Sequence, residues 1–301
     1  MNNGSNIVFI ASQPRSGSTY LQRLLSNNQW TNTTSEPWLM LYLAPLYRED
    51  LVTAEYDNRL ANKAVKLYAS KFQSLNLDDI IRKTALEYYR PLMEGYEFII
   101  DKTPRYWEIL PDLKRLFPAS KILVLKRNPT DVLRSMIRTW NITDLKRLND
   151  YYRDLLIAPF RLQQFLDDSE GDDGVVSVRY EDLVSDDTVI KGLYQWLGLT
   201  YNDDVLRIED NPKVLGHFGD PYQEKGKPKK TKEITDELMS VISGYESFLG
   251  EQFMSRYGNY EVKGAKRSVH FDMFKAGHFN DHDSISFLDK LKFKLGFNLT
   301  T

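Results

Sequence analysis

Short apolar runs alternate along the chain with longer stretches in which apolar residues recur every three or four positions. The apolar runs predict buried strands at residues 7–11, 96–101, 121–126 and 175–179. The periodic stretches predict helices at residues 18–28, 58–94, 106–116, 129–140 and 144–168. Buried strands that alternate with helices predict an α/β fold, in which helices cover both faces of a central parallel sheet.

The remaining segments have weaker patterns. Residues 27–35 are rich in turn formers, and Pro37 suits the first turn of another helix. Residues 219–232 are rich in glycine, proline and lysine, which is typical of a mobile loop. We therefore expect one main domain over residues 1–260 and a C-terminal extension over residues 261–301.

Composition narrows the class of protein. The chain has 301 residues, of which 42% are hydrophobic, and this is enough to bury one large core. Its 40 basic and 42 acidic residues give a net charge of −2, so we expect no nucleic acid as a partner. The absence of cysteine excludes disulfides and thiolate metal sites.

The sequence also predicts the cellular location of the protein. No apolar run approaches the length of a transmembrane segment, and the polar, uncharged N-terminus lacks the features of a secretory signal. We expect a soluble, cytoplasmic protein. Residues 290–295 leave two alternatives open, an amphipathic tail that packs on the domain and a contact with an anionic membrane.

The first strand leads directly into a loop that suits an anion. The run from Gln13 to Leu21 reads QPRSGSTYL and joins the strand to the first predicted helix. A strand, a turn of small residues and a helix together point backbone N–H groups and the positive end of a helix dipole at an anion. Gly17 allows the tight turn. An ATP-binding P-loop has a lysine directly before its serine or threonine, whereas this loop lacks that lysine and has Arg15 near its start. The loop thus predicts a phosphate-bearing donor other than a magnesium-bound triphosphate.

The other predicted strands also end in polar clusters. In a parallel sheet, ligands bind at the carboxyl ends of the strands. The clusters at these ends are Asp101-Lys102-Thr103-Pro104, Lys126-Arg127 and Arg179-Tyr180. Several cations at one edge predict a polyanionic ligand. Ser135 lies eight residues after Arg127, about two helical turns on, so the pair is placed to hold a second phosphate.

Together these motifs resemble those of the sulfotransferases, which use 3′-phosphoadenosine 5′-phosphosulfate (PAPS) and have a three-layer, P-loop-like α/β fold. Residues 14–19 are similar to the family's loop for the 5′-phosphosulfate. Residues 127–132 with Ser135 resemble its 3′-phosphate site, and residues 179–183 resemble its R-Y-E-D-L segment near the nucleotide. The resemblance covers residues 7–184. It implies donor contacts from Arg15, Ser16, Gly17, Ser18, Thr19, Tyr20, Arg127, Ser135 and Tyr180.

One motif is similar to a subgroup of the family. Residues 102–107 resemble the K-[ST]-P-x-Y-[FL] motif of carbohydrate sulfotransferases, whereas steroid and phenol enzymes have Lys-x-His there. The four histidines of this chain all come late, at His217, His270, His278 and His282. The resemblance to carbohydrate and tyrosylprotein enzymes places the catalytic base at Glu36, twenty-one residues after Arg15.

The resemblance implies in-line transfer of a sulfuryl group from PAPS to an acceptor hydroxyl on a carbohydrate or another hydroxylated metabolite, with release of PAP. Glu36 accepts the hydroxyl proton as general base. Arg15 and Lys102 neutralise charge on the transferring group and the departing phosphate, and Lys102 is the better acid because arginine hardly releases protons. This scheme requires no metal. Lys225 or Lys227, in a late lysine-rich loop, is expected to meet the 3′-phosphate.

Other interpretations stay open at this point. The first loop also fits a helix-capping turn, Arg127 and Ser135 fit an exposed helix, and Glu36 fits an ordinary residue before a helix. A P-loop kinase for nucleotides or small molecules is the alternative enzyme, and it would need magnesium. A non-catalytic module that binds the nucleotide is the third candidate. The sequence leaves the acceptor and the oligomeric state open.

Overall fold

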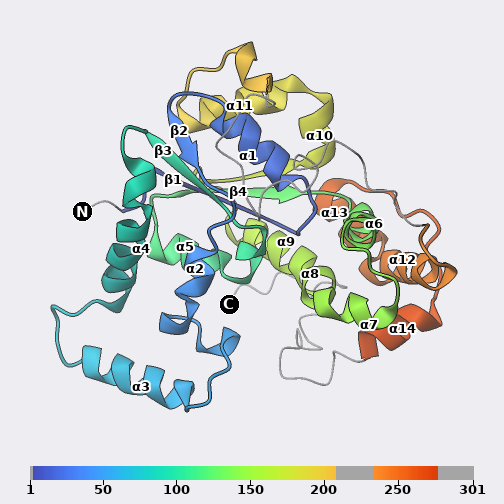
Figure 1. The fold of residues 1–301 in the computed structure, drawn as a ribbon, viewed down its shortest axis with the longest axis horizontal. Coiled ribbons are helices and arrows are strands. Elements are labelled where there is room, and N and C mark those ends of the chain that lie inside the picture. The colour runs from blue at the N-terminus through green and yellow to red at the C-terminus, as the bar shows by residue number, and fades with distance from the viewer. Residues whose placement is uncertain (1–2, 208–232, 277–301) are drawn as a thin grey trace.

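A five-stranded parallel sheet forms the centre of the computed structural model, which describes residues 3–207 and 233–276 (Figure 1). The order of its strands is β2-β3-β1-β4-β5, and every neighbouring pair is parallel. The strands are β1 (Ile7–Ser12), β2 (Thr31–Thr33), β3 (Phe98–Lys102), β4 (Lys121–Lys126) and β5 (Val175–Arg179). The predicted α/β fold with a central parallel sheet is confirmed.

The register of the sheet brings the carboxyl ends of the strands to one edge. Ile10 of β1 lies opposite Lys102 of β3 and Leu123 of β4. Lys126, the last residue of β4, lies opposite Arg179, the last residue of β5. All residues of β1 are buried because this strand is central and both of its faces are covered.

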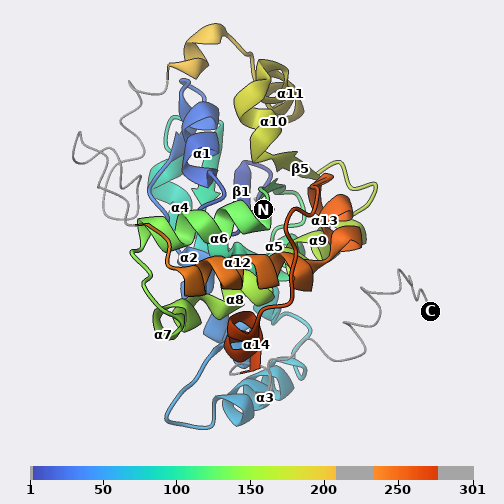
Figure 2. The same ribbon diagram turned by 90° about the vertical axis from the view of Figure 1, so that its right-hand side faces the viewer.

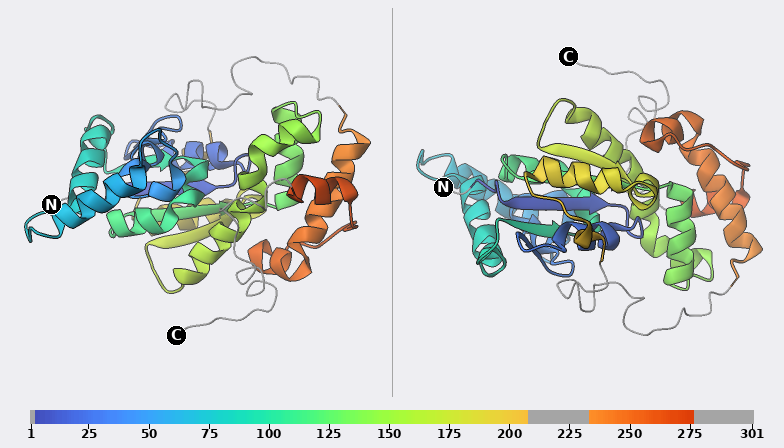
Figure 3. Two further views of the ribbon diagram at one scale, coloured as in Figure 1. Left: turned by 90° about the horizontal axis from the view of Figure 1, so that it is seen from below. Right: turned by 90° about the horizontal axis from the view of Figure 1, so that it is seen from above.

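Helices cover both faces of the sheet, as Figures 2 and 3 show. Val8 and Ile10 pack with apolar residues of α1 (Ser18–Ser26), α10 (Tyr180–Ser185) and α11 (Asp187–Leu197). Phe9 and Ala11 point the other way, as alternation along a strand requires. They pack into a larger core with α4 (Leu77–Met93), α5 (Leu110–Leu116), α6 (Pro129–Thr139), α9 (Ala158–Asp168) and α12 (Asp236–Leu249).

Two long predicted helices are interrupted in the structure. Residues 58–94 form α3 (Asn58–Ala69) and α4, because the Asn76 side chain accepts the Asp79 N–H and caps a new helix. Residues 144–168 form a series of short helices that ends in α9, since Pro159 has no N–H with which to continue the preceding helix. That series consists of α7 (Leu145–Leu148), η4 (Asn149–Tyr151), α8 (Tyr152–Leu156) and α9.

Residues 27–35, which are rich in turn formers, also contain the edge strand β2, which the sequence did not predict. Its three residues are Thr-Asn-Thr, so it shows no apolar alternation. Helix α2 (Leu39–Tyr42) starts after Trp38, so Pro37 does not occupy its first turn. The predicted helix at 106–116 is split into η3 (Pro104–Glu108) and α5.

The last described elements pack on the larger core. These elements are α13 (Glu251–Gly258) and α14 (Val269–Ala276). Three further short helices are η1 (Ala44–Leu46), η2 (Glu49–Leu51) and η5 (Asp203–Leu206). Phe271 and Phe274 of α14 are buried, and a Cβ at Gly244 of α12 would lie 2.5 Å from Cβ of Phe271. The predicted loop at 219–232 lies outside the described residues. Within the described part of the chain, every helix is too short or too polar to span a membrane.

Candidate active site

The loop between β1 and α1 has the geometry that the sequence predicts for an anion cradle. Arg15 and Gly17 both have positive φ angles, 69° and 93°, so the chain turns sharply before α1 begins. Gly17 is the N-cap residue, no side chain caps the helix, and its first turn contains no acidic residue. The backbone N–H groups at this helix end and the positive end of its dipole are therefore directed at the loop.

The loop also brings hydroxyl groups to this position. The Ser16 hydroxyl is buried, and its Oγ makes no hydrogen bond to the residues that the structure describes. Ser18 is buried at the start of α1, and the Thr19 Oγ1 accepts a hydrogen bond from the Lys102 Nζ at 3.4 Å. Tyr20 packs against the core between the sheet and α1. A buried hydroxyl without a partner favours a ligand, because an unmet polar group is costly.

Tyr180 and Arg127 close the loop from the side of β4 and β5. A Cβ at Gly17 would lie 2.3 Å from the Tyr180 ring, so only glycine allows this close packing. The Arg127 guanidinium carbon lies 4.4 Å from the centre of the same ring, and its Nη1 donates to the Arg15 carbonyl oxygen at 3.2 Å. The predicted donor residues Arg15, Gly17, Arg127 and Tyr180 are thus brought together.

Glu181 connects the Arg127 turn to the C-terminal part of the domain. Its Oε1 accepts the Asn128 N–H at 3.1 Å, and its Oε2 accepts the Tyr260 hydroxyl at 2.8 Å. Ser135 is half-buried on α6, two turns beyond Arg127. Lys126, unlike Arg127, lies on the other face of the sheet, where its Nζ is 5.5 Å from the centre of the Tyr257 ring.

Lys102 and Glu36 form an ion pair at the carboxyl end of β3. Lys102 is fully buried, and its Nζ lies 2.8 Å from Glu36 Oε1. Burial lowers the pKa of Lys102, the nearby Arg15 charge lowers it further, and the charge of Glu36 opposes both effects. Arg15 therefore lies close enough to influence the lysine electrostatically. The two residues that the sequence predicts as acid and base are in direct contact, although 66 positions separate them.

Trp38 holds the second carboxylate oxygen of Glu36, a role that the sequence reasoning missed. The indole Nε1 donates to Glu36 Oε2 at 3.2 Å, while the Trp38 backbone has φ 53°. Its backbone N–H donates to the Thr103 Oγ1 at 3.3 Å, and this hydroxyl donates to Asp101 Oδ1 at 3.1 Å. No sequence pattern indicates a positive φ at tryptophan, although its position two residues after Glu36 is suggestive in retrospect.

Asp101 makes its contacts inside the core. This buried residue directly precedes Lys102 in the sequence, and its Oδ2 accepts hydrogen bonds from the hydroxyls of Tyr89 and Tyr106. Burial raises the pKa of Asp101 to about 6, although these hydroxyl groups and Thr103 oppose the rise. Tyr106 and Trp107 are fully buried, so these two aromatic residues belong to the core.

A second ion pair, between Arg105 and Asp154, lies next to Trp38. The guanidinium of Arg105 binds both oxygens of the buried Asp154, with Nη2 at 2.7 Å from Oδ2, and lies 5.5 Å from the centre of the Trp38 ring. Gln13 donates to the Asp154 carbonyl oxygen at 2.8 Å, and its own Oε1 is buried without a hydrogen bond to the described residues. Gln13 and Arg105 lie within the motifs at residues 13–21 and 102–107, but the sequence did not predict their contacts with Asp154.

Some predicted residues lie outside the described parts of the chain. Lys225 and Lys227 belong to this group, as do His217, His278 and His282. The predicted role of Lys225 or Lys227 at the 3′-phosphate stays a prediction. His270 lies on α14, next to the buried Phe271.

Comparison with known proteins identifies the family. A sequence profile of the sulfotransferase family matches residues 7–203, about two thirds of the chain. Nodulation protein NoeE of Sinorhizobium fredii (strain NBRC 101917 / NGR234) is 32% identical over 136 residues, which are 45% of this chain and 32% of that protein. The match therefore spans about a third of that relative's length.

Two of the solved structures that are similar to this chain are sulfotransferase domains. The sulfotransferase domain from the curacin biosynthetic pathway is 17% identical with a TM-score of 0.48, and the alignment covers 98% of this chain and 99% of that one. The sulfotransferase domain from the Synechococcus PCC 7002 olefin synthase is 21% identical with a TM-score of 0.45, and the alignment covers 100% and 98%. On the match of the family profile, the chain belongs to the sulfotransferase family.

Proposed function

We propose that this sulfotransferase moves the sulfuryl group of PAPS to a hydroxyl group of a carbohydrate or another hydroxylated metabolite, with release of PAP. The observation that carries the proposal is the buried ion pair between Lys102 and Glu36, which lies beside Arg15 of the loop and Thr19 in the first turn of α1. An acid and a base in contact next to an anion site suit the transfer of an anionic group to a hydroxyl.

The donor would lie along the carboxyl ends of β1 and β4. In this proposal, the N–H groups of the loop and the hydroxyls of Ser16, Ser18 and Thr19 hold the 5′-phosphosulfate. Arg127 and Ser135 hold the 3′-phosphate, together with Lys225 or Lys227. The close contacts of Tyr180 with Gly17 and Arg127 support a role for this ring in fixing the distance between the two phosphate sites.

The proton chemistry follows from the ion pair. Glu36 accepts the proton of the acceptor hydroxyl, and the hydroxyl oxygen forms the new bond to sulfur. The bond between sulfur and the 5′-phosphate oxygen breaks, its electron pair stays on that oxygen, and Lys102 supplies a proton there. Because burial lowers the pKa of Lys102, this lysine releases a proton more readily than an exposed one. Direct contact then allows Glu36 to return its proton to Lys102.

Arg15 has a different part in this scheme. A guanidinium stays charged at any working pH, so it stabilises developing negative charge without exchanging protons. The influence of its charge on the pKa of Lys102 is consistent with a position beside the reacting groups. Its positive φ is a strained conformation, which is common where a site orients a residue closely.

The acceptor is proposed to approach Glu36 over Trp38. The indole is only partly buried and donates to Glu36, and Arg105 lies 5.5 Å from the centre of its ring, so an exposed part of Trp38 lies next to the proposed base. Sugars pack well on aromatic faces, because they present apolar C–H groups next to hydroxyl groups. This arrangement agrees with the carbohydrate class that the motif at residues 102–107 suggests.

Calorimetry with PAP and with ATP plus magnesium tests the choice of donor. We expect PAP to bind in the micromolar range or tighter in the presence of a chelator, and ATP with magnesium to bind far more weakly. Tight binding of ATP and magnesium without binding of PAP would favour the kinase alternative and overturn the proposal.

A transfer screen with sulfur-labelled PAPS then tests the reaction and finds the acceptor. Sugars, phenols and hydroxylated lipids serve as acceptors, and the expected result is a labelled product from at least one sugar. If PAP binds but no acceptor is labelled, the chain is the non-catalytic module.

A further inference from the structure

Large apolar side chains are exposed mainly in one part of the molecule. Ten of the fifteen exposed large apolar residues in the described parts of the chain lie between Tyr42 and Tyr88. Helix α3 contains four of them, which are Leu60, Val65, Leu67 and Tyr68 with exposed fractions of 52–61%. Ala69 is the one buried residue of this helix. Clustered exposed apolar residues mark interaction surfaces far more often than scattered ones do.

The same helix has a basic stripe next to its apolar face. Leu60 and Leu67 are seven residues apart and share one face, while Arg59, Lys63 and Lys66 follow the i, i+4, i+7 spacing along its flank. Residues 58–77 contain four basic residues and no acidic one, although the net charge of the whole chain is −2. The helix is therefore basic and amphipathic, and its apolar face does not pack into the core.

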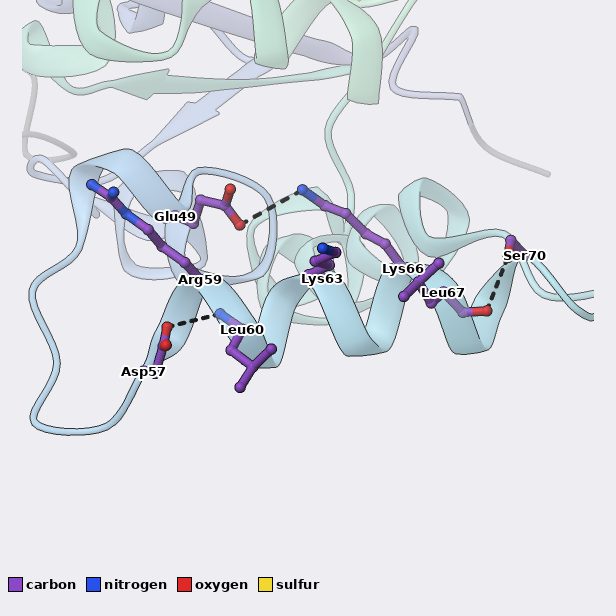
Figure 4. Close-up of a pocket in the computed structure, with 8 residues that line it drawn as sticks. All are labelled: Glu49, Asp57, Arg59, Leu60, Lys63, Lys66, Leu67 and Ser70. Carbon is purple, nitrogen blue, oxygen red and sulfur yellow. Dashed lines mark hydrogen bonds and ion pairs between the residues drawn. The ribbon is translucent and has the colours of Figure 1, made fainter.

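A hollow of about 650 Å³ lies along this stripe (Figure 4). Its two acidic residues are already engaged, because Asp57 accepts the Leu60 N–H at 2.9 Å and Glu49 lies 3.8 Å from Lys66 Nζ. Figure 4 shows Arg59 and Lys66 on the side of Glu49, while Leu60 extends on the other side of the helix. Exposed cationic and apolar side chains thus belong to the same helix and lie on different sides of it.

We propose that α3 docks this protein on an anionic lipid surface, with its leucines in the acyl boundary and Arg59, Lys63 and Lys66 at the phosphate headgroups. A basic amphipathic helix at the edge of a fold binds such a surface through apolar area and charge together. Figures 1 and 2 show α3 at the periphery of the molecule, where a flat surface can reach it. A second copy of the chain fits less well, since two basic stripes would meet.

Sedimentation with lipid vesicles tests the charge in this proposal. The full chain is mixed with vesicles of phosphatidylcholine alone or of phosphatidylcholine with phosphatidylserine. We expect binding to the anionic vesicles that weakens with salt, and at least about tenfold weaker binding by Arg59→Glu/Lys63→Glu. The matched control is Lys263→Glu/Lys266→Glu, which changes the net charge equally at exposed lysines elsewhere and should bind as the wild type does.

A second pair of variants tests the apolar face. Leu60→Gln/Leu67→Gln should lose most of the vesicle binding, whereas Val269→Gln/Met273→Gln, which changes exposed apolar residues of α14, should keep it. PAP binding and thermal unfolding of each variant show that the fold is intact, and they keep the test independent of the proposed reaction.

Three results would overturn the docking proposal. The first is equal binding to neutral and anionic vesicles or binding to neither. The second is an equal loss in the α3 variants and in their matched controls. The third is a dimer in sedimentation velocity that dissociates in Leu60→Gln/Leu67→Gln, which would assign the face to a second copy of the chain.

Discussion

The carboxyl ends of β3 and β4 carry cations in opposite environments. Lys102 after β3 is fully buried and bound to Glu36, and its pKa is lowered by burial. Arg127 after β4 is half-buried, lies on the Tyr180 ring and donates to a backbone carbonyl. A buried lysine can exchange its proton, whereas an arginine keeps its charge. The comparison indicates that β3 is the place for proton chemistry and β4 the place for binding.

Glu36→Gln should have the largest effect on the transfer rate, because glutamine has nearly the same shape as glutamate but is not a base. We expect the rate of sulfuryl transfer to fall between about a hundredfold and ten-thousandfold. The measurement is the steady-state rate with the acceptor that the screen identifies. Glu251→Gln, an exposed change on α13, is the matched control. A fall of less than about tenfold in the transfer rate would show that Glu36 is not the base. It would also contradict the assignment of proton chemistry to the end of β3.

Lys102→Met should be next in size, with an expected loss of about a hundredfold to a thousandfold in the transfer rate. The substitution removes a charged contact from a buried site. Lys102→Arg sharpens the test, since arginine restores the charge but does not release a proton. Full activity of the arginine variant would show that Lys102 acts through charge alone, as Arg127 does in our account.

Arg127→Ala should mainly weaken the donor, since it removes a charged hydrogen-bond donor from a binding position. We expect the KM for PAPS to rise about tenfold to a hundredfold, with kcat changed much less. Arg127→Lys should recover only part of the affinity, because lysine lacks the planar group that lies on Tyr180. A drop in kcat at unchanged KM would assign Arg127 to the chemical step.

The smallest effect concerns pH and the buried carboxylate of Asp101, which precedes Lys102 in β3. Burial raises the pKa of Asp101 from 3.8 to about 6, so between these values the folded protein retains a proton that the unfolded chain releases. Stability from this group is therefore lost as the pH rises through this window, by about 2 kcal/mol. Urea unfolding of the wild type and of Asp101→Asn from pH 4 to 6 measures the difference. A decline of equal size in the variant would contradict this assignment.

The sequence predicted the parts of the site that depend on local pattern. The strand β4 was predicted at its observed bounds, because a turn precedes its apolar run and a proline helix start follows it. Motif spacing placed Arg15, Lys102 and Arg127 at strand ends, which the parallel register brings to one edge. The contact between Glu36 and Lys102 agrees with the roles expected from the resemblance, although the roles themselves remain proposals.

The remaining features depend on tertiary contacts that leave no local signal. Tyr89 and Asp101 meet only because α4 packs on β3, and the positive φ of Trp38 follows from its contacts with Thr103 and Glu36. The strand β2 was missed because its polar residues pair at the edge of the sheet, where apolar alternation is not needed. A single-sequence pattern does not report such distant partners.

Calorimetric titration of PAP into Glu36→Gln and Arg127→Ala, side by side with the wild type, tests the division between β3 and β4 most directly. The measurement needs no acceptor. Our account predicts that Glu36→Gln binds PAP as tightly as the wild type does, whereas Arg127→Ala binds it at least about tenfold more weakly. Unchanged affinity in Arg127→Ala together with lost affinity in Glu36→Gln would contradict it.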